Sequence, residues 1–437
     1  MSLTIGVVGC GYLGAVHAAC MAELGHRVVG VDLDTAKVAA LQAASAPFFE
    51  PGLDALLARM LATGRLCFTG DFAALVDADA VFVCVGTPQR KGELAADTSQ
   101  VVAATQTVAQ HVRGPALVVG KSTVPVGTAA KLAELLSASG SQLELAWNPE
   151  FLREGHAVPD TLSPDRLVLG VTSERAESLL REVYATTIAA GTPVVTCDFE
   201  TAEMVKVAAN AFLATKISFI NAMAEVCEAA GADVTLLAEA IGHDDRIGRK
   251  FLGAGLGFGG GCLPKDIRAF MARAGELGAD QALAFLREVD AINLRRRSRM
   301  VEMAREACGG GFVGRRIAVL GAAFKPQSDD IRDSPALNVA AQMRLQGGEV
   351  VVSDPHALDN ARRLWPDLSY AATAEEACEG ADVVLLLTEW PQFTGLDPEA
   401  LGRIVRVRSI LDGRNALDPG AWRAAGWTYR ALGRPRA

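Results

Sequence analysis

Gly9-Cys10-Gly11-Tyr12-Leu13-Gly14 directly follows the apolar run Ile5–Val8 and precedes a segment of helical character. This is the G-x-G-x-x-G pattern in the strand–turn–helix setting of a dinucleotide-binding fold. Glycines in such a turn let the backbone approach a pyrophosphate at a helix N-terminus. Asp32 ends the next apolar run, where a carboxylate can accept a hydrogen bond from the adenosine ribose 2′-OH. Because the same charge repels a 2′-phosphate, the sequence predicts a site for NAD rather than NADP.

Short apolar runs recur along the first part of the chain at the spacing of a strand–helix repeat. They are bounded by Gly, Pro or polar residues and alternate with amphipathic segments. Strands are expected at 4–9, 27–32, 80–86, 116–120 and 143–147. This alternation predicts a doubly wound parallel sheet.

The region from about Glu200 to Gly231 has a different pattern. It lacks Pro, reaches its first Gly only at its end, and carries apolar residues such as Val207, Phe212 and Ile220 at helical spacing. One long helix is therefore expected. Further helices are expected through about residue 306, which makes the middle of the chain all-α.

The strand pattern of the first residues returns after this helical section. Ile317–Gly321 echoes Ile5–Gly9, and Val350–Asp354 echoes Val28–Asp32. The predicted fold is α/β: two Rossmann-like doubly wound parallel-sheet domains joined by a helical domain with one long central helix. The expected bounds are 1–198 for the NAD-binding domain, 199–308 for the helical and dimerisation domain, and 309–437 for the second Rossmann-like domain. Because Gly321–Lys325 lacks the full glycine turn, the second domain is expected to bind a different phosphate ligand.

Length and composition exclude several classes of protein. A chain of 437 residues is too long for one ordinary core. The net charge of -9 and the pI near 5.3 argue against nucleic acid or an anionic membrane as a partner. The N-terminus has no signal-peptide pattern and no apolar run reaches transmembrane length, so a cytoplasmic protein is expected. The nine cysteines include no C-x-x-C pair, and no metal site is expected.

The segment Gly257–Asp266 is the most unusual in the chain. Four of the five residues before Cys262 are glycine, which would let the backbone approach a ligand. Lys265 follows closely, and a nearby cation favours the thiolate, the nucleophilic form of cysteine. The alternative is a flexible loop with an incidental thiol.

Three further segments place polar groups where a ligand would bind. Lys206 and Asn210 are four residues apart and share a helix face, although a solvated edge gives the same pattern. Lys121–Thr128 and Asn148–Gly155 each follow a strand end, where open α/β sheets bind ligands. Taken singly, each of these two could be ordinary turn chemistry.

Together these segments resemble the UDP-glucose/GDP-mannose dehydrogenase family. The likeness runs from the N-terminus to about Arg414, and its motifs are Lys121–Thr128, Asn148–Gly155, Phe251–Asp266 and Phe324–Pro335. The resemblance implies that Cys262 is the nucleophile and that the other catalytic residues are Lys206, Asn210, Asp266, Glu150 and Thr123. The glycine turn and the resemblance together give the expected NAD contacts: Gly9, Gly11, Leu13, Gly14, Asp32, Lys37, Thr87, Thr123, Glu154, Lys265 and Arg332. The resemblance implies these nucleotide-sugar contacts: Glu150, Phe151, Leu152, Arg153, Glu154, Lys206, Asn210, Arg246, Phe251, Leu252, Gly253, Ala254, Gly255, Gly259, Lys325 and Arg414.

The reaction implied by the resemblance is a four-electron oxidation of a nucleotide sugar at C6 to the uronic acid. A thiohemiacetal and then a thioester would form on Cys262, with Lys206 and Asn210 stabilising the oxyanions. Asp266 or Glu150 would move protons, and which carboxylate serves which step stays open. UDP-glucose is the favoured substrate; GDP-mannose, dTDP-glucose and UDP-N-acetyl-aminosugars are the alternatives within the family. Arg246 would reach into a neighbouring subunit's site, so a homodimer or a larger homo-oligomer is expected.

Two rival functions fit the sequence less well. A two-electron β-hydroxyacid dehydrogenase needs neither the cysteine nor a second nucleotide-type domain. A silent NAD-sensing protein would be expected to lose Cys262 or Lys206, and both are present. Gly261 and Leu13 stand where many relatives carry Ser and Val, but neither change removes a reacting group. An active enzyme is therefore expected.

Overall fold

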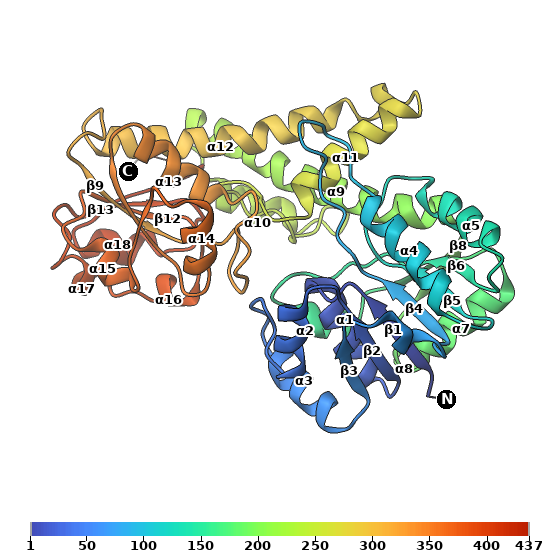
Figure 1. The fold of residues 1–437 in the computed structure, drawn as a ribbon. Helices are drawn as coiled ribbons and strands as arrows, with labels where there is room; N and C mark the ends of the chain where they lie inside the picture. The colour runs from blue at the N-terminus through green and yellow to red at the C-terminus, as the bar shows by residue number, and fades with distance from the viewer. Residues whose placement is uncertain (1, 436–437) are drawn as a thin grey trace. The chain divides into compact units, whose positions relative to one another are not determined.

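The computed structural model describes residues 2–435, and the chain folds into two compact units (Figure 1). The N-terminal unit consists of residues 1–209 and 268–278, and the C-terminal unit of residues 210–267 and 279–437. The predicted domain boundaries at 198/199 and 308/309 divide the chain differently, into three parts, and stay a prediction.

The N-terminal unit is built on an eight-stranded sheet in the order β3-β2-β1-β4-β5-β6-β7-β8. Its strands are β1 Thr4–Val8, β2 Arg27–Val31, β3 Leu66–Thr69, β4 Ala80–Val83, β5 Leu117–Gly120, β6 Glu144–Trp147, β7 Leu167–Gly170 and β8 Val194–Cys197. Its main helices are α1 Tyr12–Glu23, α2 Thr35–Gln42, α3 Leu53–Ala62, α4 Ser99–His111, α5 Thr128–Ala138, α6 Ala157–Leu162, α7 Glu174–Val183 and α8 Ala185–Ala189. Strand β1 serves both faces, since Ile5 and Val7 enter one core and Val8 enters the other. The predicted doubly wound sheet is confirmed.

The sheet differs from the prediction at its outer strands. Strands β3, β7 and β8 were not expected, and β7 pairs antiparallel with β6. Strands β3 and β8 are the two edges of the sheet. Their side chains are only partly buried, so they lack the continuous apolar run by which a central strand is recognised.

The C-terminal unit contains a six-stranded parallel sheet in the order β11-β10-β9-β12-β13-β14. Its strands are β9 Arg316–Leu320, β10 Glu349–Ser353, β11 Ser369–Tyr370, β12 Val383–Leu386, β13 Ser409–Asp412 and β14 Thr428–Ala431. Its flanking helices are α13 Pro335–Leu345, α14 Leu358–Leu364, α15 Ala374–Cys378, α16 Pro391–Thr394, α17 Pro398–Leu401 and α18 Pro419–Ala424. The order repeats β3-β2-β1-β4-β5-β6, so the predicted second Rossmann-like sheet is confirmed.

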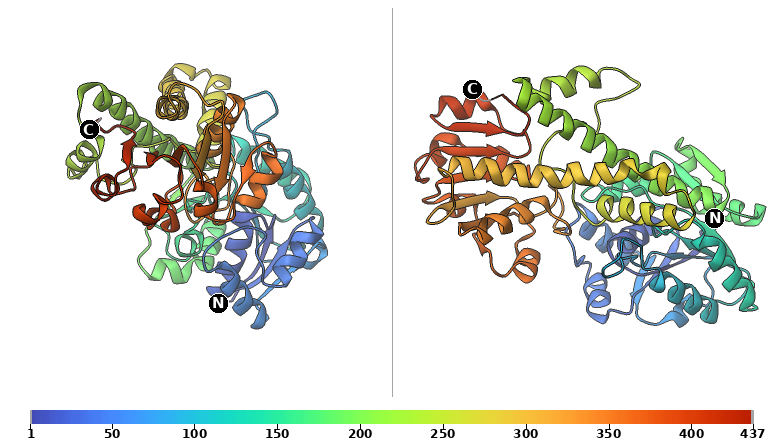
Figure 2. Two further views of the ribbon diagram at one scale, coloured as in Figure 1. Left: turned by 90° about the vertical axis from the view of Figure 1, so that its left-hand side faces the viewer. Right: turned by 90° about the horizontal axis from the view of Figure 1, so that it is seen from above.

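The helical section is led by α9, Phe199–Ala230, which confirms the predicted long helix. It is followed by α10 Val234–Gly242, α11 Leu263–Glu276 and α12 Phe285–Ala307. Helix α12 lies against α13 and the sheet of the C-terminal unit (Figure 2). Among the described residues, α9 is the one helix whose length and composition would suffice to cross a membrane. Ala202, Ile220 and Ala224 of α9 are buried in protein cores, which is the environment of a core helix.

Candidate active site

The glycine turn after β1 leaves backbone N–H groups open to a ligand. Gly9 has φ +87°, and a side chain there would meet the backbone of Val85. A Cβ on Gly14 would overlap the carbonyl oxygen of Gly9, whereas a Cβ on Gly11 would meet nothing. Helix α1 begins after Gly11 without a side-chain cap, so its first N–H groups are available to an anion. Gly9 and Gly14 therefore serve packing, and Gly11 lies where a pyrophosphate would approach.

Asp32 links this turn to the end of β2. Its Oδ2 accepts hydrogen bonds from the Cys10 N–H and from Lys37 Nζ, both at 2.8 Å. Burial acts to raise the pKa of Asp32, but the bonds from Lys37 and from the Asp34 and Cys10 N–H groups outweigh it and lower that pKa. The carboxylate is therefore ionised near neutral pH, as a ribose acceptor that disfavours a 2′-phosphate must be. The residues present fit NAD.

The equivalent position in the C-terminal unit is Asp354, and its contacts differ. Its Oδ2 accepts the N–H groups of Ala322 and Ala323 at 2.7 and 3.0 Å and the indole N–H of Trp390 at 3.0 Å. The side chain is 2% exposed. Donors of the protein itself thus satisfy the carboxylate that would otherwise accept a hydrogen bond from a ribose. This agrees with the expectation that this domain binds a different ligand.

Cys262 lies at the start of α11 in the C-terminal unit. The Asp266 N–H donates to the Cys262 carbonyl at 2.9 Å, so Cys262 is the N-cap of the helix. The side chain is exposed, and the positive end of a helix dipole stabilises a thiolate there. One turn later, Asp266 accepts from Asn210 Nδ2 and from Lys265 Nζ, both at 2.7 Å. The unit therefore brings together four predicted site residues: Cys262, Lys265, Asp266 and Asn210.

The N-terminal unit contains a second group of predicted residues. Lys206 Nζ on α9 donates to Glu150 Oε1 at 2.9 Å, and the Lys206 side chain is only 6% exposed. The ammonium also lies 5.7 Å from the centre of the Phe151 ring. Glu150 Oε2 accepts the Leu152 N–H at 2.8 Å. Desolvation strengthens electrostatic interactions of such an ammonium, which suits it to stabilise an oxyanion.

The glycines before Cys262 have a role in packing. Protein atoms fill the space that their side chains would need: Asn293 at Gly257, the Asp333 carbonyl at Gly259, the Phe324 ring at Gly260 and the Arg332 guanidinium at Gly261. These contacts give a structural reason for the glycines, since they allow the loop to pack closely against its own unit. The approach of a ligand to this backbone stays a prediction. The same packing places Arg332, a predicted cofactor contact, beside the residue that precedes Cys262.

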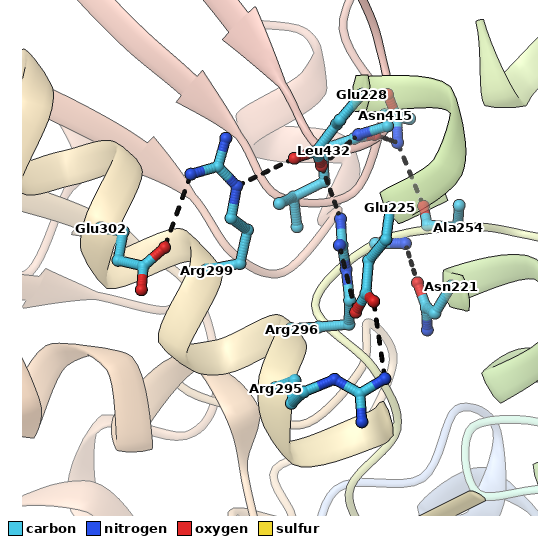
Figure 3. A network of polar contacts seen from close by, with 12 residues as sticks. Asn221, Glu225, Glu228, Ala254, Arg295, Arg296, Arg299, Glu302, Asn415 and Leu432 are labelled. Carbon is cyan, nitrogen blue, oxygen red and sulfur yellow. Dashed lines mark hydrogen bonds and ion pairs between the residues drawn. The ribbon is translucent and has the colours of Figure 1, made fainter. Parts of the chain in front are cut away.

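Residues 251–255, a predicted substrate loop, are held by two asparagines (Figure 3). Asn221 Oδ1 on α9 accepts the Gly255 N–H at 2.9 Å, and Asn415 Nδ2 donates to the carbonyl oxygens of Ala254 and Leu432. Asn221 is completely buried. The loop conformation is thus set by α9 and by the segment that follows β13.

Glu228 of α9 joins this helix to α12, as Figure 3 shows. The fully buried Arg296 donates to Glu228 Oε1 at 2.9 Å, and Arg299 donates to Glu228 Oε2 at 2.8 Å. Glu228 Oε1 also accepts the Gly433 N–H at 2.9 Å. Removing one partner of such a buried pair is destabilising, because it leaves an uncompensated charge.

Arg414 was expected to contact the diphosphate, and the structure gives its guanidinium other partners. Nε donates to the Leu387 carbonyl at 2.8 Å, while Nη1 and Nη2 donate to the carbonyls of Gly257 and Phe324 at 3.1 Å. It also pairs with Glu389 at 3.3 Å. Arg414 therefore fastens three loops of the C-terminal unit, including the ones before Cys262 and Lys325.

Four other predicted residues have local partners. Thr87 Oγ1 donates to the Thr123 carbonyl at 2.8 Å, so two predicted cofactor contacts hold each other. Arg153 pairs with Asp160. Arg246 pairs with Asp244, and its side chain is 89% exposed.

Three buried polar residues near these groups were not among the predicted site residues, although Lys121 belongs to the predicted Lys121–Thr128 segment. Glu203, three residues before Lys206, accepts the Gly127 and Ala129 N–H groups at 2.6 and 2.7 Å, and burial raises its pKa to about 7. Lys121 donates to Asn148 Oδ1 at 2.8 Å, and burial lowers its pKa to about 8. Glu50 is also buried. Glu203 had a signal in the sequence because it shares a helix face with Lys206, and Lys121 had one because it follows a strand end.

The chain matches three family models in succession. Residues 3–188 match the NAD binding domain of the UDP-glucose/GDP-mannose dehydrogenase family, residues 200–295 its central domain and residues 318–419 its UDP binding domain. The chain is 41% identical to the UDP-glucose 6-dehydrogenase of Rhizobium meliloti (strain 1021), over 99% of this chain and 100% of that one. It is 40% identical to the UDP-glucose 6-dehydrogenase TuaD of Bacillus subtilis (strain 168), over 99% of this chain and 93% of that one.

Solved structures give the same result. A UDP-glucose dehydrogenase from the hyperthermophilic archaeon Pyrobaculum islandicum is similar with a TM-score of 0.91 and 38% identity, over 99% of this chain and 98% of that one. A UDP-D-ManNAc dehydrogenase from Pyrococcus horikoshii has a TM-score of 0.87 and 29% identity, and each chain is covered completely. The chain is a member of the UDP-glucose/GDP-mannose dehydrogenase family, and the resemblance drawn from its sequence motifs is confirmed.

Proposed function

We propose that this chain oxidises UDP-glucose at C6 to UDP-glucuronate, through a thiohemiacetal and a thioester on Cys262. The observation that carries the proposal is the position of this exposed thiol at the N-cap of α11, one turn before the buried group formed by Asp266, Asn210 and Lys265. NAD, which the glycine turn and Asp32 would hold, would supply the oxidant for two successive two-electron oxidations at C6. The chain's own residues form the covalent adduct, stabilise the oxyanion and transfer the protons.

Cys262 supplies the covalent step. As a thiolate it attacks C6 of the aldehyde, and the carbonyl oxygen becomes an oxyanion that Lys206 and Asn210 stabilise by charge and hydrogen bonding. After the second oxidation, water attacks the resulting thioester, the C–S bond breaks, and the thiolate is restored as the acid forms. Holding the aldehyde as an adduct of Cys262 keeps it from escaping between the two oxidations.

Proton transfer is assigned to the two carboxylates that hold these donors. Glu150 accepts from Lys206, and Asp266 accepts from Asn210 and Lys265. Each carboxylate is one hydrogen bond away from a group that would face the oxyanion, so either can take a proton from the alcohol or from water. Thr123, held through its carbonyl by Thr87, would position that water.

The nucleotide is assigned to the C-terminal unit. Residues 318–419 match the family's UDP binding domain, and Asp354 is occupied by backbone N–H groups. Lys325 would contact the diphosphate, and Arg414 would support that contact by fixing the Phe324 carbonyl next to it.

A homodimer is proposed from the surface of α9. Phe212, Phe219 and Val226 are 66%, 48% and 57% exposed. Their seven-residue spacing puts them on one face of the helix. An apolar stripe of this kind marks an interface, and the exposed Arg246 could then reach a partner's site.

The net charge of -9 fits a cytoplasmic protein that binds neither nucleic acid nor membrane.

NADH formation with a panel of nucleotide sugars tests the substrate. UDP-glucose is expected to give the highest kcat/KM among UDP-glucose, dTDP-glucose, GDP-mannose and UDP-N-acetylmannosamine. The site is expected to discriminate between these sugars. A site whose polar groups pair with one base and one pattern of sugar hydroxyls leaves some of those groups unpaired when a different nucleotide sugar binds. A higher kcat/KM for GDP-mannose or for the aminosugar would overturn the substrate assignment and leave the family unchanged.

A further inference from the structure

A buried carboxylate that the proposed reaction does not use, Glu50, lies between two loops of the N-terminal unit. Its side chain is 6% exposed. The residue precedes the turn Pro51-Gly52, where Gly52 has φ +79° and leads into α3. A buried carboxylate must be well supplied with hydrogen-bond donors, and the donors of Glu50 identify what it holds.

Three donors converge on this carboxylate. The Gly155 N–H donates to Oε2 at 2.6 Å and the Ala157 N–H to Oε1 at 2.7 Å. The Tyr12 hydroxyl donates to Oε2, and the Gly155 N–H also approaches that hydroxyl at 3.0 Å. The Tyr12 ring packs against Phe48 with the ring centres 4.8 Å apart. One segment, Phe48–Glu50, therefore holds Tyr12 by both its ring and its hydroxyl.

The three donors come from two segments of the N-terminal unit. One is predicted to contact NAD; in the other, Glu150–Glu154 are predicted to contact the nucleotide sugar, and Glu154 also NAD. Tyr12 is the first residue of α1 and belongs to the glycine turn that fits NAD. Gly155 and Ala157 end the segment that starts with Glu150, the partner of Lys206. Glu50 is thus a short hydrogen-bonded link from the cofactor turn to the substrate segment.

We propose that Glu50 is a positioning residue that couples the binding of the cofactor to the binding of the nucleotide sugar. The proposal rests on the function proposed above. A ligand that orders the glycine turn also fixes Tyr12, and through Glu50 it fixes the 150–157 segment, so the second ligand meets a segment that is already ordered. Coupling of this kind is reciprocal and is typically worth about 5-fold or more in affinity.

Two substitutions separate the link from the fold. Tyr12→Phe removes one hydroxyl, keeps the ring on Phe48, and leaves both backbone bonds to Glu50 in place. Glu50→Gln replaces an oxygen by an NH2 group, so one of the N–H donors of Gly155 and Ala157 faces another donor. Glu134→Gln, an exposed residue of α5, is the matched control for the loss of a carboxylate.

The experiment measures the Kd of the nucleotide sugar by calorimetry, with and without saturating NADH, which permits no turnover of the sugar. The nucleotide sugar used is the one that the substrate panel identifies. A wrong substrate assignment is therefore detected in the panel and does not affect the ratio of the Kd without NADH to the Kd with NADH. The wild type and Glu134→Gln are expected to bind the sugar at least about 5-fold more tightly with NADH. In Tyr12→Phe the ratio is expected to fall close to one.

The same ratio can overturn the proposal. A wild-type ratio of one would contradict the coupling itself. A wild-type ratio in both Tyr12→Phe and Glu50→Gln would show that Glu50 only stabilises the fold. For Glu50→Gln, a lower Tm with an unchanged ratio also contradicts the proposal, because a purely structural residue changes stability and not coupling.

Discussion

Cys262→Ser is expected to lower the rate of uronate formation by roughly 10³-fold or more, the scale on which removal of a catalytic nucleophile acts. Serine keeps the size of the side chain, so the loop that packs around Gly257–Gly261 is undisturbed. A hydroxyl at the N-cap of α11 is not ionised near neutral pH, however, and the helix end cannot make it a strong nucleophile. The variant should fold, bind NADH like the wild type, and fail to produce acid.

Cys67→Ser is the matched control. Cys67, on the edge strand β3, is also an exposed residue. Partial burial of its thiol raises its pKa, so mild alkylation should modify it more slowly than Cys262. Alkylation of the wild type should abolish activity as Cys262 is modified, and bound nucleotide sugar should protect it. Uronate production at the wild-type rate by Cys262→Ser would contradict this account. Inactivation by modification of Cys67 alone would contradict it too.

Lys206→Met is expected to lower kcat by about 10²- to 10³-fold, the cost of removing one preorganised oxyanion donor. KM for the sugar should change much less, because the ammonium interacts more strongly with the oxyanion than with the ground state. The substitution also leaves Glu150 without its 2.9 Å partner. Steady-state kinetics of Lys206→Met and Lys206→Arg, with the exposed Lys131→Met as the control, separate the two effects.

The pattern expected for Lys206→Arg follows from its charge. It keeps a cation near Glu150, so it should retain the fold and the binding of NADH while recovering only part of kcat, because a guanidinium is larger and differently shaped. A kcat near the wild-type value in Lys206→Met would show that Lys206 is a structural partner of Glu150 and not an oxyanion donor.

The sequence predicts the two sheets well because their central strands are continuous apolar runs. Val81–Val83 and Val383–Leu386 are buried on both faces, and such a run between turn residues is typical of a central parallel strand. The edge strands β3 and β8 were missed, because their half-exposed side chains give no such run.

The positions of candidate site residues on helices could be predicted from local sequence, while their roles stay predictions that come from the family resemblance. Cys262 before α11, and Lys206 with Asn210 on α9, lie on elements whose periodicity is visible in the sequence. Contacts between segments distant in sequence could not be predicted. Arg414 donates hydrogen bonds to three carbonyls, and Glu50 accepts one from the Gly155 N–H. These bonds join residues 27 to 157 positions apart in the sequence, and no local pattern encodes them.

The glycines at 257–261 show that composition alone does not reveal why side chains are absent from a segment. Composition indicates only that side chains are excluded there, and both an approaching ligand and an approaching piece of protein exclude them. The structure supplies the packing reason, since Asn293, Asp333, Phe324 and Arg332 fill the space that side chains would need.

The stoichiometry of complete conversion tests the thioester mechanism most directly. With limiting UDP-glucose, excess NAD and the reaction run to its end, NADH is measured by absorbance and the sugar products by chromatography. A thioester on Cys262 that is hydrolysed to the acid predicts two NADH for each UDP-glucose consumed, with UDP-glucuronate as the product. One NADH for each sugar, with a free aldehyde as the product, would contradict the account, because it would mean that the oxidation stops before any thioester forms.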